Sequence, residues 1–275
     1  MPAMRRDSPR KRLTRPERAA RRLLQAHEKR ERFVPLAADF APRSLTEACA
    51  IQDAFVALRA QRLGALAGYK IALTSEAMRR FVGVDTPQAG AMLESTIRRT
   101  PARVRAADYM HLIVEFEIAV ELADDLPAAD KPFFRDRVAK SVGAVMAALE
   151  LADDRNADYS RLAAHPLDLI ADNCWNEGAV LGQAVREWRH IDLAEVRGVA
   201  AINGKTVGEG RGRDAMGHPF DAVAWLADHL ASIGRGLVRG DVVITGSIVA
   251  SKYPNPGDRV EFDLGPLGGV VLQVE

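Results

Sequence analysis

The stretch HLIVEFEIAVEL, residues 111–122, decides the fold. From Phe116 to Leu122 every second residue is apolar, and the positions between them are glutamates or alanine. Such a period of two is the pattern of a β-strand that buries one face in a core. The sequence therefore predicts a strand here, with its glutamates on the face turned away from that core.

Two of these glutamates carry the most informative local signal. Glu115 and Glu117 lie two positions apart, so a strand directs both carboxylates to the same side. Two neighbouring anions repel each other unless a cation lies between them, and Mg²⁺ or Mn²⁺ prefers such oxygen ligands. Glutamates that alternate on a solvent-facing strand are the simpler alternative. A third acid, Glu150, ends the apolar run 145–149, where a carboxylate is costly to bury without a partner.

The chain before this strand reads as mainly helical. Helical spacing of apolar residues begins at Pro16. Ser44 and Glu47 are spaced as a capping box, which predicts a helix over residues 45–63. A strand over residues 65–71 and a short helix over residues 76–81 follow.

The chain after this strand reads as mainly short strands. Asn203-Gly204 separates two strand-like segments and is typical of a two-residue hairpin turn. The predicted helices are residues 136–146 and 219–233, and the other predicted strands are residues 147–151, 178–182, 241–245, 259–263 and 269–274. We therefore expect an α+β fold, with an N-terminal helical section (residues 16–64) followed by a mixed β-sheet body (residues 65–275).

Composition narrows the function classes. The 275 residues are 48% hydrophobic and carry a net charge of +1, which disfavours nucleic acid or a membrane surface as the main partner. Two cysteines, Cys49 and Cys174, are too few for a disulfide framework, and we find no transmembrane run. We expect a cytoplasmic protein.

The basic charge is concentrated at the start of the chain. Residues 1–32 hold 12 Lys and Arg against 4 Asp and Glu. Residues 1–15 have little to bury and are expected to form a disordered basic arm. An organellar targeting segment or a nucleic-acid-binding segment is the alternative, whereas no apolar block of the kind found in secretory signals follows.

Three further polar sites are ambiguous from the residues alone. Lys70 lies among apolar neighbours, and desolvation there would lower its pKa towards values useful in acid–base catalysis, although a lysine that reaches the surface is the simpler interpretation. Asp85 and Asp172 both read first as turn residues.

Several other motifs are weak evidence for a functional site. Gly208–Gly212 (GEGRG) resembles a phosphate loop only superficially, because no helix follows it directly. Cys174 lacks a CxxC partner and is expected to be a small buried thiol. His218 precedes Pro219 and is expected to cap a helix. Ser247 lacks the G-x-S-x-G pattern of a serine hydrolase.

Taken together, the ordered motifs resemble the family of 2-oxopent-4-enoate hydratases and 4-oxalocrotonate decarboxylases, within the fumarylacetoacetase-like superfamily. The resemblance extends from about Ala19 to the C-terminus. The motifs that carry it are GYKIALTS (68–75), GVD (83–85), VEFEIA (114–119), LE (149–150) with DR (154–155), ADN (171–173), VLG (180–182), GHP (217–219) with AVAWLA (222–227), and GDVVITGS (240–247).

The resemblance implies a fumarylacetoacetase-like body and a divalent metal, Mg²⁺ or Mn²⁺, held by three carboxylates. The implied ligands are Glu115, Glu117 and Glu150. Lys70 matches the family's proton-transfer lysine, and Asp85 matches an acid that positions water or a substrate hydroxyl. The remaining positions implied to bind substrate are Ser247, which would receive the substrate carboxylate, and Asp172.

The implied reaction is addition of water to a 2-hydroxy-2,4-dienoate to give a 4-hydroxy-2-oxo acid, as in meta-cleavage catabolism of aromatic compounds. The alternatives are decarboxylation of a 2-oxo-3-enedioate, another reaction of 2-oxo acids, and a non-catalytic subunit that binds a carboxylate. The family also leads us to expect a homo-oligomer, with a partner subunit in a hydratase–decarboxylase complex as the alternative assembly. Two features depart from the family pattern: residues 174–177 add bulk and charge near the expected pocket, and Lys252 could meet a second substrate carboxylate or face solvent.

Overall fold

The computed structural model describes residues 12–275, so most of the expected basic arm, residues 1–15, lies outside the described residues. The first helix, α1, spans Arg15–Glu28 and begins one residue earlier than expected. Thr14 caps it, and Glu17 returns a hydrogen bond to the Thr14 backbone N–H, which completes a capping box. The predicted box at Ser44 forms only in part. Ser44 caps the next helix, but Glu47 accepts from the Arg43 N–H instead.

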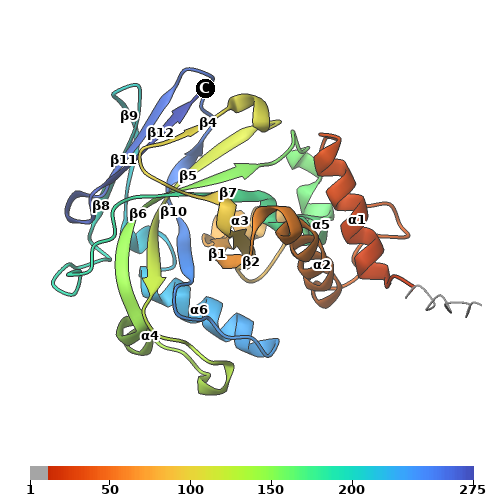
Figure 1. Ribbon diagram of the computed structural model, residues 1–275, viewed down its shortest axis with the longest axis horizontal. Helices are drawn as coiled ribbons and strands as arrows, with labels where there is room; N and C mark the ends of the chain where they lie inside the picture. The colour runs from red at the N-terminus through yellow and green to blue at the C-terminus, as the bar shows by residue number, and fades with distance from the viewer. Residues whose placement is uncertain (1–11) are drawn as a thin grey trace, which may run out of the picture.

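The described residues form an α+β fold, as predicted (Figure 1). The helices are α1 Arg15–Glu28, α2 Leu45–Leu63, α3 Glu76–Val82, α4 Arg135–Ser141, α5 Pro166–Ala171 and α6 Pro219–Ser232. The strands are β1 Leu66–Ala72, β2 Gln88–Leu93, β3 Ile97–Arg99, β4 Ala102–Val104, β5 Leu112–Leu122, β6 Val142–Asp153, β7 Asn176–Leu181, β8 Arg197–Ile202, β9 Lys205–Arg211, β10 Val242–Lys252, β11 Arg259–Asp263 and β12 Gly269–Val274. None of the helices within residues 12–275 has the length and apolar character needed to span a bilayer.

Within residues 12–275 the strands form two sheets. The larger has the order β2-β1-β10-β5-β6-β7-β3, and the smaller has the order β4-β12-β11-β8-β9. Both are mixed. In the larger sheet β1 runs parallel to β10 while β5 runs antiparallel to both of its neighbours, and in the smaller sheet β12 runs parallel to β4 and antiparallel to β11. The predicted strand 111–122 is therefore β5, near the centre of the larger sheet.

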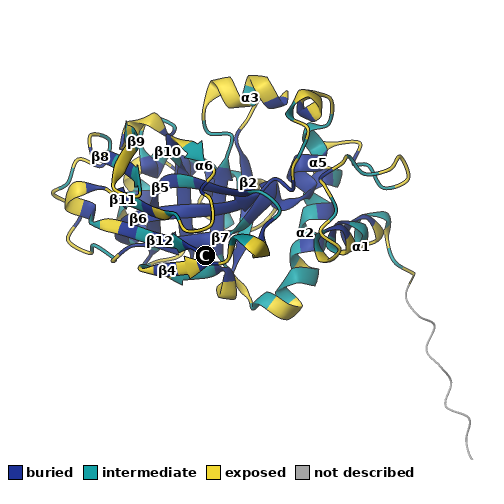
Figure 2. Ribbon diagram, turned by 90° about the horizontal axis from the view of Figure 1, so that it is seen from above, coloured by how far each residue is buried: buried dark blue, intermediate teal, exposed yellow. Residues whose placement is uncertain are grey.

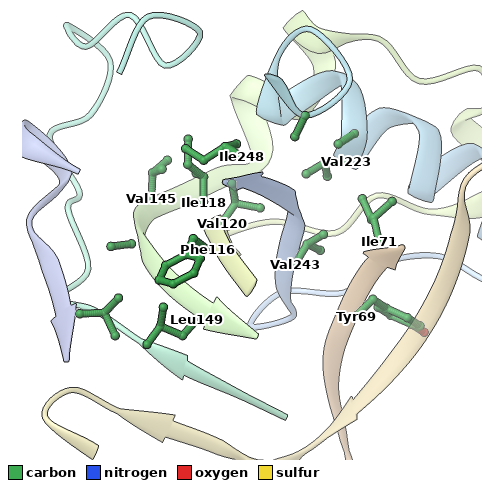
Figure 3. Packing of buried hydrophobic residues seen from close by; sticks show 14 of the residues in the cluster. Tyr69, Ile71, Phe116, Ile118, Val120, Val145, Leu149, Val223, Val243 and Ile248 are labelled. Atoms are coloured by element: carbon green, nitrogen blue, oxygen red, sulfur yellow. The ribbon is translucent and has the colours of Figure 1, made fainter. Parts of the chain in front are cut away.

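The main core lies between the two sheets and under α6. Phe116 of β5 and Phe262 of β11 are fully buried, with ring centroids 5.4 Å apart. Figure 3 shows Phe116, Ile118 and Val120 of β5 directed into this cluster. Because these alternate residues face the core, the odd-numbered glutamates of β5 face the opposite side of the sheet.

The prediction of a helix over residues 136–146 is wrong in its second half. The helix α4 ends at Ser141, and Val142–Met146 opens the long strand β6. Every residue of β6 except Gly143 is buried, because the strand lies between β5 and β7 with both faces covered. Period cannot distinguish a helix from a strand in such a continuous apolar run.

Several other elements agree with the sequence analysis, whereas the end of β10 does not. The helix α2 spans the predicted residues, and the hairpin β8–β9 turns at Asn203-Gly204, where both residues have positive φ. The Gly208–Gly212 segment belongs to this hairpin and not to a phosphate loop. His218 caps α6 by accepting from the Phe220 N–H. The strand β10 continues past its predicted end at Thr245 to Lys252.

The N-terminal helices cover one end of the larger sheet. The helix α2 packs between α1 and α5 through a small cluster that includes Leu23, Ile51, Phe55 and Ala171 (Figure 1). In contrast, α3 stands out from the body, and Figure 2 shows most of its surface exposed.

Candidate active site

Three glutamates meet on the face of the larger sheet that is turned away from the main core. Glu115 of β5 lies directly opposite Glu150 of β6, and Glu117 follows two residues along β5. Carboxylate oxygens of the three side chains lie within 4.8 Å of one another. Glu117 and Glu150 are fully buried, and Glu115 is half-buried. The strand period thus brings together the acids that the sequence singled out.

A backbone N–H holds Glu117. The N–H of Gly246 in β10 donates to Glu117 Oε2 at 2.7 Å. Gly246 has a φ of 107°, and a Cβ at this position would lie 2.4 Å from the Thr74 side chain. Only glycine fits both this backbone conformation and this close approach. The Thr-Gly-Ser segment, where the predicted strand 241–245 ends, is therefore an irregularity inside β10 that presents an N–H to the acidic cluster.

Two side chains hold Glu150. Lys70 Nζ of β1 lies 2.8 Å from Glu150 Oε1, and Asn176 Nδ2 of β7 donates to the same oxygen at 2.9 Å. Lys70 is only 4% exposed. It therefore forms a buried ion pair and does not reach the surface, in contrast to the simpler interpretation of its sequence.

The donor set fits a divalent cation. Ser251 donates to Glu115 Oε1 at 2.7 Å, while Glu117 Oε1 and Glu150 Oε2 are buried without a hydrogen-bond partner. A buried carboxylate oxygen that lacks a donor is costly, and three carboxylates face a single ammonium group. Ions that bind carboxylates at about 2.0–2.6 Å bridge oxygens that are up to about 4–5 Å apart. Glu115, Glu117 and Glu150 therefore meet the requirements of a metal site in position, charge and unused oxygens.

The electrostatics of Lys70 differ from the sequence-based expectation. Burial alone would lower the pKa of Lys70, but Glu150 and Glu115 raise it further than burial lowers it, so the pKa lies above its ordinary value. The expectation of a lowered lysine pKa is thus wrong for this arrangement, because the neighbouring anions outweigh desolvation. Burial, together with Glu150 and Glu115, raises the pKa of Glu117 well above its ordinary value.

A cavity of about 710 Å³ opens beside the cluster. Lys70, Glu115, Ser247 and Ser251 line one end of it. Apolar and aromatic side chains line most of the remainder. A pocket of this size with a few convergent polar groups is the usual form of a small-molecule site.

A left-handed turn shapes one wall of this cavity. Asn173, Cys174 and Trp175 all have positive φ, at 53°, 49° and 60°. Three consecutive non-glycine residues in this region are strained, and such strain is concentrated at functional sites. The Asn173 side chain fixes the turn because it both accepts from the Ala91 N–H at 2.8 Å and donates to the Ala91 carbonyl at 2.9 Å. Cys174 and Trp175 then line the cavity.

Cys174 is the small buried thiol that the sequence predicted. It is 4% exposed, and burial raises the pKa of its thiol to about 12. A thiol with such a pKa is a poor nucleophile at neutral pH. Of the bulk and charge expected near the pocket from residues 174–177, the bulky side chain of Trp175 does line the cavity. The charged side chain of Glu177 does not line it and pairs with Arg59 on α2.

Three of the other candidate residues differ in their relation to the cavity. Ser247 lines it, although its hydroxyl donates to the Val249 carbonyl at 2.7 Å. Asp85 is exposed in the loop between α3 and β2 and does not line the cavity. Lys252 ends β10 and is not among the lining residues.

Asp172 differs most from its expected place. It is 1% exposed and does not line the cavity, and its two oxygens contact His27 Nε2, at 2.6 Å, and Arg155. These contacts of Asp172 join α1, the end of β6 and the turn at residues 173–175. Burial would raise the pKa of Asp172, but His27 and Arg155 lower it below its ordinary value. The structure thus makes Asp172 an anchor of the cavity wall, whereas we expected a residue that touches substrate.

Sequence reasoning missed Asn176 and Ser251. Each donates to a cluster carboxylate, yet neither belongs to a spacing that predicts such a role. Ser251 could have been found only by extending the period of two from Ser247 along β10, beyond the predicted end of that strand.

The fold and this acidic centre define a class of proteins, and the sequence comparison agrees. The family model described as fumarylacetoacetate (FAA) hydrolase C-terminal matches residues 69–275. The chain belongs to this family, which confirms the resemblance drawn from the sequence.

Similar proteins narrow the class further. The chain is 34% identical over 232 residues to a 2-keto-4-pentenoate hydratase of Paraburkholderia phymatum, covering 84% of this chain and 87% of the relative. It is 28% identical over 247 residues to a 4-oxalocrotonate decarboxylase of Pseudomonas putida, covering 90% of each. The solved 4-oxalocrotonate decarboxylase from Pseudomonas putida G7, complexed with magnesium and adipate, has a TM-score of 0.86 at 25% identity, covering 96% of this chain and 99% of that structure.

Proposed function

We propose that this protein is a hydratase that adds water to a 2-hydroxy-2,4-dienoate and gives a 4-hydroxy-2-oxo acid. One observation carries the proposal: three glutamates with two unpartnered buried oxygens converge beside Lys70 at the polar end of a cavity. The hydratase relative at 34% identity supports the choice of reaction.

Glu115, Glu117 and Glu150 would hold the metal, and we propose Mg²⁺ or Mn²⁺ because their donors are all carboxylate oxygens. When bound, such an ion supplies Lewis-acid stabilisation of negative charge on the C2 oxygen of the substrate.

The chain's own residues set the proton chemistry. Lys70 lies beside the cluster, with Nζ 2.8 Å from Glu150 Oε1, and lines the polar end of the cavity. We assign it as the residue that transfers a proton to and from the dienoate. Ser247 lies at the same end of the cavity and is our candidate for contact with the substrate carboxylate.

A second candidate is decarboxylation of a 2-oxo-3-enedioate. The specific observation that favours it is the likeness, over 96% of this chain, to the solved 4-oxalocrotonate decarboxylase. The third candidate is a non-catalytic subunit that binds a carboxylate. For the assembly, we propose a homo-oligomer, with a complex that includes a partner subunit as the alternative. Light scattering of the purified chain tests the assembly directly.

The experiment follows ultraviolet absorbance of a 2-hydroxy-2,4-dienoate with and without added Mg²⁺ or Mn²⁺. Metal-dependent loss of the dienoate band without CO₂ release supports the hydratase, and CO₂ release from an enedioate selects the decarboxylase. Glu115→Gln should abolish turnover, whereas Glu121→Gln, on the same strand but outside the cluster, should not. A folded protein that turns over neither substrate would refute both enzymatic assignments.

A further inference from the structure

The cavity beside the acidic cluster has two unlike ends. Its polar end is formed by Lys70, Glu115, Ser247 and Ser251. The remainder is lined mainly by aliphatic and aromatic side chains from α3, β5, β10 and the segment 159–175. A volume of about 710 Å³ lies in the upper half of the range of about 300–1,000 Å³ typical of sites for drug-sized ligands. An unsubstituted five-carbon dienoate would leave much of it unfilled.

Three neighbouring aromatic rings form one part of the cavity lining. Tyr159 lies 5.9 Å from Trp175 and 6.4 Å from Phe81, measured between ring centroids, and all three line the cavity. The Tyr159 hydroxyl donates to the buried Asp154 at 2.9 Å, so that hydrogen is already used. The rings of Phe81, Tyr159 and Trp175, which we call the aromatic wall, thus offer mainly apolar surface to a ligand.

Apart from Lys70, the described residues that line the cavity offer no positive charge to a second carboxylate. Of the described residues that line the cavity, Lys70 is the single cationic one, and it already pairs with Glu150. Lys252, the obvious candidate for such a role, does not line the cavity, although Ser251 and Tyr253 on either side of it do. A carboxylate placed against the aromatic wall would lose hydration without gaining a cationic partner from the lining.

Building on the proposed hydratase function, we propose that the natural substrate carries an apolar tail, either aryl or branched alkyl, beyond the dienoate carbons. The aromatic wall receives this tail. The same wall discriminates against substrates that end in a second carboxylate.

The test measures binding of unreactive saturated 2-oxo acids to the protein with Mg²⁺ present, by calorimetry and by tryptophan fluorescence. The probes are 2-oxopentanoate, 2-oxo-5-phenylpentanoate, and the matched pair 6-methyl-2-oxoheptanoate and 2-oxohexanedioate, in which an isopropyl group replaces a carboxylate. Each buried methylene should strengthen binding about fourfold. The phenyl acid should therefore bind at least about tenfold more tightly than 2-oxopentanoate, and the isopropyl acid at least about tenfold more tightly than its dicarboxylate partner. Equal or tighter binding of the dicarboxylate overturns the proposal.

A variant pair tests the position of the tail. Phe81 is 46% exposed on α3, so Phe81→Lys should fold, and Phe81→Met is its control. Lysine should reverse the preference within the matched pair, whereas methionine should keep it. If both variants retain the wild-type preference, the aromatic wall does not contact the tail and the proposal fails.

The outcome for the tail is separate from the outcome for the reaction. Metal-dependent hydration with no preference for apolar tails refutes only the tail. A strong apolar preference in binding, with no turnover of any dienoate, refutes only the hydratase.

Discussion

Replacing Glu117 by glutamine should stabilise the metal-free protein and weaken metal binding at the same time. Glu117 is fully buried, and one of its oxygens has no partner. Glutamine keeps a carbonyl oxygen for the Gly246 N–H and offers an amide N–H to the unpartnered Glu150 Oε2. The substitution therefore removes a repelling charge and adds a donor where one is lacking.

The expected magnitude follows from the burial of this charge. Relief of an uncompensated buried carboxylate should increase the free energy of unfolding of the metal-free protein by about 1–3 kcal/mol. For a chain of this size each kcal/mol raises Tm by about 2–4 °C. Substitution of a residue that only hydrogen-bonds to a metal ligand typically changes metal affinity about 10–100-fold. Loss of a direct ligand should therefore weaken Mg²⁺ or Mn²⁺ binding at least about 100-fold.

The pH dependence has a defined sign. The pKa of Glu117 is raised by burial and by its neighbouring glutamates, so Glu117 takes up a proton at a higher pH in the folded state than in the unfolded chain. Its contribution to stability is therefore present at low pH and is lost as the pH rises through the raised value. The stability advantage of Glu117→Gln should be largest at neutral or higher pH and should shrink on mild acidification.

The assay is thermal unfolding in EDTA and with Mg²⁺ or Mn²⁺, together with calorimetric titration of the metal. Glu121→Gln is the matched control, because Glu121 lies on the same strand and lacks a place in the cluster. The reasoning is refuted if Glu117→Gln unfolds at a lower temperature than wild type in EDTA, or if it binds the metal with wild-type affinity.

Three other substitutions test separate parts of the site. Lys70→Gln should reduce kcat by about 10²–10⁴-fold if Lys70 transfers the proton, with metal affinity measured in parallel to show that the cluster persists. Asp172→Asn should lower the free energy of unfolding by about 3–5 kcal/mol at pH 7, because His27 and Arg155 lose their charged partner. Since the pKa of Asp172 is lowered in the folded state, this difference should shrink as the pH falls below about 3.8, and denaturant unfolding measured at several pH values tests this. Asp85→Asn should change kcat by less than about threefold, because Asp85 does not line the cavity, and a loss of about 100-fold would show that the catalytic role implied by the family holds after all.

The sequence predicted those parts of the structure that depend on local pattern. The alternation in residues 111–122 placed β5 to within one residue, and the Ser44 cap placed the start of α2. The same alternation put Glu115 and Glu117 on one face. These signals are strong because a strand has a fixed period of two and because helix starts need side-chain acceptors.

The sequence failed where tertiary contacts decide the outcome. Val142–Met146 became a strand because it lies between β5 and β7, and β10 continued through Gly246 because its N–H binds Glu117. The direction in which the pKa of Lys70 shifts depends on Glu150, which is 80 positions away in the chain. No local pattern carries such information, since only the register of β1, β10, β5 and β6 sets these distances.

The architecture explains how such a repelling cluster is held together. Glu117 alternates along β5 with Phe116 and Ile118, which are fully buried in the core between the sheets. Moving the carboxylates apart would require β5 to shift against that core, where displacement of one large apolar side chain costs several kcal/mol. The packing on one face of the strand therefore fixes the acids on the other, and a cation that enters finds its ligands already in place. The same reasoning predicts that core substitutions such as Phe116→Leu will weaken metal binding although they change no ligand. If the metal affinity of such variants equals that of the wild type, the geometry of the cluster is set locally and not by the core.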